Sequence, residues 1–263
     1  MNTRTVPAVV LAAAFASPAL AGGDKVAFPA NYATGALYAT VDRHDIKQHR
    51  ELWATPASAV ASVKAGKGIP GGTVLTLVQF KARLDDKGAP LRDANGRFLK
   101  GDLVAYTVME KRAGWGAEYG PELRNGEWEY QVFGPDKAVN AKANLKSCFQ
   151  CHKPHAGQDY VISLARLSGT SPGARVSATA GPDRVAIADF RFGPEKLVVA
   201  KGQYVTWTNT DDSPHQVTIA GEGGARTPVI LKGQSQAFKF TEAGTFDYIC
   251  GLHPAMKGKV EVR

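Results

Sequence analysis

Residues 184–263 alternate between short apolar runs and polar turns. The runs are rich in β-branched and aromatic residues, and Gly, Pro, Asp or Asn separates them. Such runs are typical of strands. They lie at residues 184–192, 196–202, 204–209, 215–220, 236–240, 245–250 and 257–262. Seven short strands in this length predict a β-sandwich with Greek-key connections.

The pattern in residues 22–167 is less regular. A helix is predicted over 55–68, with Thr55 as its cap and glycine at its end. A second helix is predicted over 137–152. Strands are predicted at 71–84, 103–112 and 128–134, with a turn-rich segment at 85–102. This order predicts an α+β domain, mainly antiparallel sheet, and differs from that of an all-helical cytochrome.

A change of composition separates the two parts. Residues 168–183 (SGTSPGARVSATAGPD) are almost all small or polar and lack apolar periodicity. The segment is interpreted as a linker between a domain at 22–167 and a domain at 184–263. The alternative, a long surface loop within one domain, is less common in compact structures.

The first residues have the features of an export signal. Residues 1–21 contain Arg4, then an apolar run, then an Ala-Leu-Ala end that suits a signal peptidase. The apolar run is too short to span a membrane, and no later run is long enough. We expect a signal peptide at 1–21 and a mature periplasmic protein without a membrane anchor.

The charge of the chain is moderately basic. It carries 32 Lys+Arg and 24 Asp+Glu, a net charge of +8, without a dense basic cluster. Scattered lysines usually form a solvated surface. We therefore expect neither nucleic acid nor a membrane as a partner.

Two of the three cysteines form the motif C-x-x-C-H at Cys148, Cys151 and His152. Two thiols one helical turn apart can add to the two vinyl groups of a haem, and the adjacent imidazole can reach the iron. A redox dithiol would not need His152, and a zinc site would need a second ligand pair that the neighbouring sequence lacks. The motif predicts one covalent haem c.

The third cysteine has metal-ligand neighbours. Cys250, His253 and Met256 lie in one short segment (CGLHPAM), and His215 precedes a predicted strand. A thiolate, two imidazoles and a weak thioether form the trigonal site of a blue copper centre. These four residues predict one type 1 copper. The alternative is a buried cysteine beside two surface histidines.

Residues 184–263 resemble the cupredoxins, amicyanin and plastocyanin among them. The likeness includes the four ligand positions, Pro254 after the second histidine, and the V-x-W-x-N strand at 205–209. Many cupredoxins have Asn after the first histidine ligand, whereas this chain has Gln216. The difference affects the hydrogen bonds around the ligands and so the redox potential.

Residues 28–167 resemble the cytochrome P-460 family and its cytochrome c-prime-beta relatives. The residues that carry the likeness, in chain order, are RELWATP (50–56), KAGKGIPGGTV (64–74), GDLVAY (101–106), GEWEYQVF (126–133), CFQCH (148–152) and DYVIS (159–163). The resemblance implies a five-coordinate haem with His152 as its proximal ligand and an open distal face. We also allow for a homodimer formed through this domain.

The same resemblance implies three distal positions. The hydroxylamine-oxidising cytochromes P-460 carry a cross-linking lysine and an acidic residue where this chain has Leu77 and Thr107, and Arg50 matches a distal arginine. Arg50 could equally be a solvated or ion-paired surface residue. Hydroxylamine oxidation needs a base near the iron, whereas a mostly apolar open pocket favours neutral diatomic ligands.

The predicted function is therefore a periplasmic redox protein that couples a nitric oxide- or carbon monoxide-binding haem to a copper electron-transfer centre and to redox partner proteins. One alternative is an enzyme that oxidises hydroxylamine or a related small nitrogen compound and passes electrons to copper. Another is pure electron transfer with a six-coordinate haem. The sixth ligand would then be Met109, His44 or His49, each of which also has an ordinary structural interpretation.

Overall fold

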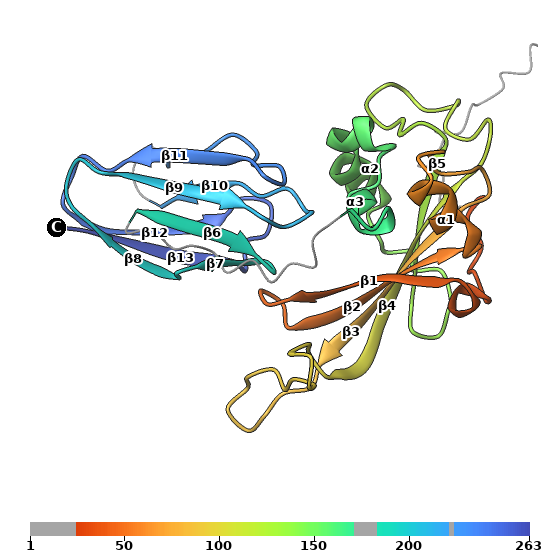
Figure 1. The fold of residues 1–263 in the computed structure, drawn as a ribbon, viewed down its shortest axis with the longest axis horizontal. Helices are drawn as coiled ribbons and strands as arrows, with labels where there is room; N and C mark the ends of the chain where they lie inside the picture. Colours follow the sequence, from red (N-terminus) through yellow and green to blue (C-terminus); the bar gives the residue numbers. More distant parts are fainter. Residues whose placement is uncertain (1–24, 171–182, 221–223) are drawn as a thin grey trace, which may run out of the picture.

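The computed structural model describes residues 25–170, 183–220 and 224–263, and it forms two bodies of different architecture (Figure 1). The predicted signal peptide at 1–21 and most of the predicted linker at 168–183 lie outside the described residues. None of the helices in the described ranges is both long and apolar enough to cross a membrane.

The N-terminal domain is an antiparallel sheet with strand order β1-β2-β3-β4-β5. The strands are β1 (Ala36–Arg43), β2 (Gln48–Thr55), β3 (Val74–Ala82), β4 (Lys100–Lys111) and β5 (Trp128–Phe133). The helices are α1 (Ser58–Lys64), α2 (Leu145–His152) and α3 (Leu164–Leu167), with 3-10 turns at η2 (Tyr32–Thr34) and η3 (Lys153–Gln158). The predicted α+β class, mainly antiparallel sheet, is confirmed.

Side chains alternate across β3 and β4, so the sheet has two apolar faces. Leu75 and Met109 lie on the face that the three helices cover, where Phe149 of α2 is fully buried. Val78 and Val108 lie on the opposite face, where aromatic residues of the N-terminal segment pack. Each strand is therefore fixed in register by burial on both sides.

Two predicted helices differ from the structure. Helix α1 is shorter than predicted, and Thr55 is not its cap: Thr55 ends β2, and its hydroxyl donates to the Tyr32 carbonyl. The helix predicted over 137–152 forms only as α2. Its first half instead turns back along β5, because the Asn140 amide donates to the Val132 carbonyl and Val139 forms a bridge with Phe133. Strands β1 and β2 were not predicted.

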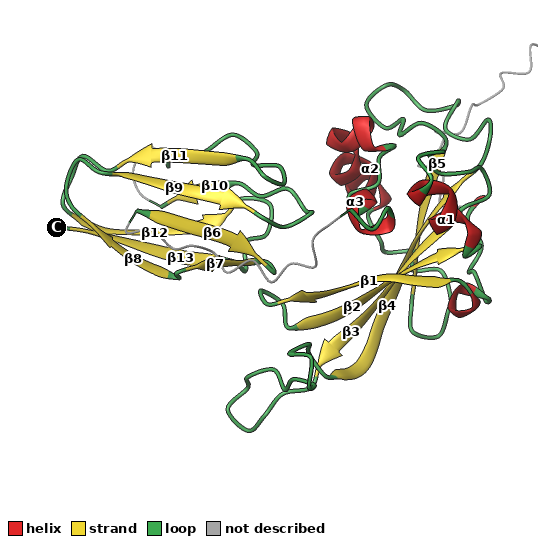
Figure 2. Cartoon of the chain, in the orientation of Figure 1, coloured by secondary structure: helices red, strands yellow, loops and turns green. Residues whose placement is uncertain are grey.

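The C-terminal domain consists of two four-stranded sheets, with orders β10-β12-β13-β8 and β11-β9-β6-β7, and the described part of it contains no helix (Figure 2). The strands are β6 (Arg184–Ala188), β7 (Arg191–Gly193), β8 (Lys196–Val199), β9 (Tyr204–Asn209), β10 (Val217–Ile219), β11 (Ser235–Lys239), β12 (Gly244–Cys250) and β13 (Lys257–Val262). The predicted β-sandwich is confirmed.

The first predicted strand of this domain, 184–192, is divided into β6 and β7. Asp189 and Phe190 separate them with positive φ angles of 49° and 55°. The Asp211 carboxylate accepts hydrogen bonds from both of their backbone amides, at 2.6 and 2.9 Å. These bonds hold the turn, which lies at the end of the sandwich nearest the N-terminal domain (Figure 1).

Candidate metal and haem sites

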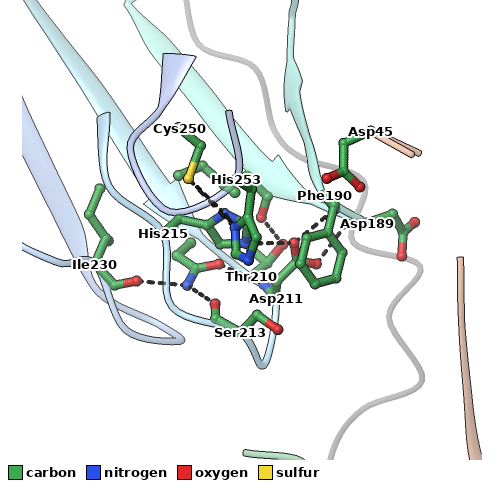
Figure 3. A network of polar contacts seen from close by, with 12 residues as sticks. Asp45, Asp189, Phe190, Thr210, Asp211, Ser213, His215, Ile230, Cys250 and His253 are labelled. Atoms are coloured by element: carbon green, nitrogen blue, oxygen red, sulfur yellow. Dashed lines mark hydrogen bonds and ion pairs between the residues drawn. The ribbon is translucent and has the colours of Figure 1, made fainter. Parts of the chain in front are cut away.

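Three predicted copper ligands meet at the end of the sandwich. The Cys250 sulfur lies 3.5 Å from His215 Nδ1 and 3.6 Å from His253 Nδ1, and the two nitrogens are 3.3 Å apart (Figure 3). All three atoms face one point, and His215 and Cys250 are fully buried. One sulfur and two imidazole nitrogens in a triangle fit the trigonal donor set of a type 1 copper.

The short loop after β12 sets this geometry. The His253 amide donates to the Cys250 carbonyl, and the Cys250 amide donates to the Met256 carbonyl at 3.1 Å. Met256 is buried against the core of the sandwich. A β-carbon at Gly251 would lie 2.6 Å from the Gln216 side-chain oxygen, so a larger residue there would displace that side chain.

Gln216, where many cupredoxins have Asn, is held on the other side of the cysteine. Its backbone amide donates to the Cys250 sulfur at 3.5 Å, and its side chain donates to the Thr227 carbonyl. Burial acts to raise the pKa of the Cys250 thiol. The hydrogen bonds with the two histidines and this amide have a larger, opposite effect, so the pKa falls to about 5. The thiolate is the form that binds metal.

A buried carboxylate orients His215. The His215 Nε2–H donates to Asp211 at 3.0 Å, which leaves Nδ1 for a metal. Asn209 fixes the same loop by donating to the Ser213 and Ile230 carbonyls and accepting from the Asp211 amide. Sequence reasoning missed both residues. The pattern N-T-D-D-S-P-H, with Asx residues before a ligand, is the signal that could have shown them.

The C-x-x-C-H motif lies on α2, which begins at Leu145 and ends at His152. The His152 Nδ1–H donates to the Tyr160 carbonyl at 2.7 Å and leaves Nε2 for an iron. Burial lowers the pKa of His152 to about 4, so the ring is neutral, as an axial ligand must be. Asn125 holds the helix by donating to the Phe149 carbonyl at 3.0 Å.

The thiols of this motif do not have the properties of a thiolate site. Burial raises the pKa of Cys148 to about 11, with the neighbouring Cys151 as a smaller cause. Among the described residues, no group of three His, Cys, Asp or Glu side chains that could hold a metal forms at this motif, so the zinc alternative lacks its remaining ligands.

A cavity lies between α2 and the helix-side face of the sheet. His152 lines it together with the three predicted distal residues, Arg50, Leu77 and Thr107. Leu77 pairs with Thr107 across β3 and β4, which places both on the same face. Met109 also lines the cavity, but His44 and His49 do not. The His49 Nδ1–H donates to the buried Asp42 carboxylate at 2.8 Å, and His44 packs on Phe98.

Known proteins match the two parts separately. Residues 29–163 match the family model for cytochrome P460, and residues 182–263 match that for copper binding proteins of the plastocyanin/azurin family. Amicyanin from Paracoccus denitrificans is 38% identical over 102 residues, 37% of this chain and 78% of that protein. Amicyanin-alpha from Methylorubrum extorquens is 38% identical over 104 residues, 38% of this chain and 87% of that protein.

Among solved structures, the novel purple cupredoxin from Nitrosopumilus maritimus is 26% identical with a TM-score of 0.28, covering 30% of this chain and 98% of its own. The family matches agree with the two sites: a cytochrome domain with a haem motif, followed by an electron-transfer domain with copper ligands. The chain therefore belongs to the cytochrome P460 family through residues 29–163, and its residues 182–263 belong to the plastocyanin/azurin family of copper-binding proteins that includes the amicyanins.

Proposed function

We propose that this protein is a periplasmic redox protein in which a five-coordinate haem c binds a diatomic gas such as nitric oxide and exchanges electrons with a type 1 copper. Cys148 and Cys151 hold the haem, His152 is its proximal ligand, and four residues hold the copper: His215, Cys250, His253 and Met256. The haem supplies an iron that binds the gas, and the copper supplies one-electron transfer. Export rests on the signal-like residues 1–21.

The observation that carries this proposal is the scarcity of carboxylates in the cavity, whose two histidines, His152 and His253, are proposed metal ligands. Among the described residues that line it, the single carboxylate is Asp212, which comes from the copper domain. Arg166 and Lys232 both form ion pairs with Asp212. Both ion pairs occupy this carboxylate, so the described lining offers no unpaired carboxylate. Hydroxylamine oxidation needs a base near the iron, so this lining suits ligands that react without losing protons.

The rest of the lining mixes aliphatic side chains with polar ones, among them Arg43, Arg50 and Thr107. Leu52, Leu75 and Leu77 present aliphatic surface to the cavity. Beside them, Arg50 donates to Gln48 and Gln79 at 3.0 and 3.2 Å, and Gln79 donates to Thr107 at 3.0 Å.

The guanidinium of Arg50 stays charged in this row of hydrogen bonds. Burial is the main cause that lowers its pKa, to about 10, so it remains protonated at neutral pH. Its hydrogen-bond partners are amide oxygens, which do not neutralise it. A cation in this place stabilises a bound diatomic ligand that gains electron density from iron.

An optical spectrum of the purified holoprotein tests the proposal. We expect a high-spin ferrous haem whose spectrum shifts on adding nitric oxide or carbon monoxide, together with the intense thiolate-to-copper band of the oxidised protein. A low-spin haem that ignores both gases would contradict the gas-binding site and point to Met109 as a sixth ligand. N-terminal sequencing of the protein from the periplasmic fraction tests the export and the cleavage after residue 21.

The oxidase alternative keeps one observation in its favour, the presence of Asp212 in the cavity lining. A carboxylate beside the iron is the kind of group that such an oxidation requires. Turnover of hydroxylamine, with loss of the copper band as the copper is reduced, would support that activity and contradict the gas-binding proposal. Oxidation of the ferrous protein with nitric oxide bound, without turnover of hydroxylamine, would support the gas-binding proposal.

A further inference from the structure

The two domains touch through a small set of residues at the copper end of the sandwich. In the N-terminal domain these residues lie at the end of β1 and on α3, and in the copper domain they lie in the turn between β6 and β7 and in the loop before His215. The β1–β2 hairpin extends toward the copper domain (Figure 1). Val41 of β1 packs against the hydrophobic core of the copper domain.

One contact joins the surroundings of the two sites. The Arg43 guanidinium lies over the Phe190 ring, 3.8 Å from its centroid. The Phe190 ring also lies 5.0 Å from the ring of His253 and 5.4 Å from that of His215, both in edge contacts (Figure 3). Arg43 also lines the cavity that Cys151 of the haem motif lines. Contacts therefore run from the lining of the haem cavity through Arg43 and Phe190 to a copper ligand.

Two polar contacts between the domains, and one within the haem domain, hold Arg43 against Phe190. Arg166 of α3 forms an ion pair with Asp212, whose side chain is only 9% exposed. The His44 amide donates to the Asp189 carbonyl at 3.3 Å. Asp45 holds the Arg43 guanidinium with two hydrogen bonds, at 2.7 and 2.5 Å. A partly buried ion pair is screened less than a surface pair, so it can fix the orientation of the domains.

The haem cavity opens on the copper site as a result. His253 and Phe190 of the copper domain line the same cavity as His152 and Cys151 of the haem motif. His253 is also the copper ligand of the described triad that is not fully buried. The ligand with an accessible edge is thus the one that faces the haem domain.

We propose that this junction is an internal redox contact, in which the Arg166–Asp212 ion pair holds Phe190 and His253 against Arg43 and the haem cavity so that one electron passes directly between the two sites. The inference rests on the proposed function, because it requires both metal centres. One centre loses the electron that the other gains, so the step needs no proton and no further reactant. The partner for the exposed copper ligand is therefore the protein's own haem domain.

Pulse radiolysis of the full-length holoprotein tests the inference. A radiolytic one-electron reductant reduces one centre within the pulse, and the copper band and the haem band then report how the electron redistributes. We expect a single internal phase whose rate does not depend on protein concentration. A rate proportional to protein concentration would overturn the inference, because it would mean exchange between molecules.

The Arg166→Gln variant tests the anchor. It removes the ion pair at the junction, and we expect it to lose most of the amplitude of the fast internal phase while its copper and haem spectra stay unchanged. Arg112→Gln is the matched control, because Arg112 forms an ion pair with Glu110 inside the haem domain. The internal phase should survive in this control. An unchanged internal phase in Arg166→Gln would show that the ion pair does not position the contact.

The charge-swapped pair Arg166→Asp with Asp212→Arg covers the case in which a single change misfolds. We expect the swapped pair to recover internal transfer relative to Arg166→Asp alone, and no recovery would contradict the anchor. A Phe190→Leu variant should slow the internal phase with Arg166 intact. If the wild-type protein holds both centres and binds gas but shows no internal phase, this inference fails and the proposed function stands. If either metal centre is missing, the proposed function fails.

Discussion

The side chain of Asp211 accepts a hydrogen bond from His215, with its Oδ2 oxygen 3.0 Å from the Nε2 nitrogen. The same carboxylate accepts the amides of Asp189 and Phe190, the turn that meets the haem domain. One buried group therefore fixes both His215, the first proposed copper ligand, and Phe190, which contacts Arg43. The position of the copper ligand and the contact between the domains share a support.

Changing Asp211 to Asn should weaken copper binding. The substitution removes the charge that orients the His215 ring, and the loss of such an outer partner typically costs roughly 10- to 100-fold in metal affinity. Competition with a chelator of known affinity measures the effect. Asp247→Asn is the control, because Asp247 is an exposed residue of β12 that pairs with Lys259. Equal copper affinity in the two variants would contradict this role of Asp211.

Cys250→Ala should remove the intense thiolate-to-copper absorption band. No other cysteine in the chain belongs to the copper domain, so no thiolate remains to replace it. The absorption spectrum of the copper-loaded variant is the measurement, and the haem band serves as an internal control. A band that persists would mean that another residue supplies the sulfur and that the ligand assignment is wrong.

The double change Cys148→Ala and Cys151→Ala should abolish covalent haem and leave the blue colour. The two domains have separate hydrophobic cores, so the copper domain should fold without the haem. Haem staining after denaturing electrophoresis, together with the copper band of the native protein, gives both readings. Loss of both centres would show that the domains depend on each other to fold.

Leu77→Ala should change how carbon monoxide binds. Leu77 lines the cavity that contains His152, so removing its branch opens space beside the ligand. Stopped-flow binding to the ferrous protein measures the rate. Leu103→Ala is the control, because Leu103 packs on the opposite face of the same sheet. Each variant should lose on the order of 2 kcal/mol of stability, but the rate should change only for Leu77. An unchanged rate would remove Leu77 from the site.

His44 should make the protein less stable in mild acid. Burial is the main cause that lowers its pKa from 6.5 to about 4, with Arg191 and Arg92 adding to it. Between these values the unfolded chain binds a proton that the folded protein does not, so stability falls as pH drops from 6.5 toward 4. The ring is partly exposed, so we expect a loss on the order of 1 kcal/mol.

Urea unfolding at several pH values measures this loss. A His44→Gln variant should have a flatter acid slope than the wild type, and an identical slope would show that other groups cause it. His155 is the comparison, because burial also lowers its pKa and it lies in η3 rather than in the turn between β1 and β2. Replacing His155 by Gln should leave the contribution of His44 to the acid slope of stability unchanged.

The two metal-binding motifs could be predicted because their chemistry depends on short spacing. Cys148, Cys151 and His152 lie on one helical turn, and the loop from Cys250 to Met256 closes on itself, so neither needs distant contacts to be recognised. The strands of the copper domain were predictable for a related reason, since each run alternates and ends at a turn residue.

What the sequence did not predict depends on tertiary contacts. The segment 137–144 contains good helix formers, but pairing of Val139 with Phe133 overrides that preference. Strand β1 includes Asp42, which is buried only because His49 of β2 and Arg97 pair with it. The stack of Arg43 on Phe190 joins residues from different domains, and no local pattern in either domain indicates it.

The turn at Asp189 and Phe190 also bears on how such a chain evolves. A bulky residue with positive φ costs roughly 1–2 kcal/mol, so glycine at position 190 would relieve the backbone of the copper domain. The Phe190 ring offsets that cost, because it is buried in the core of the copper domain and also contacts Arg43 at the junction. Recombination that exchanged either domain for a relative would separate Arg43 from Phe190 and remove part of that benefit. The fused gene is therefore expected to be inherited and to diversify as one unit.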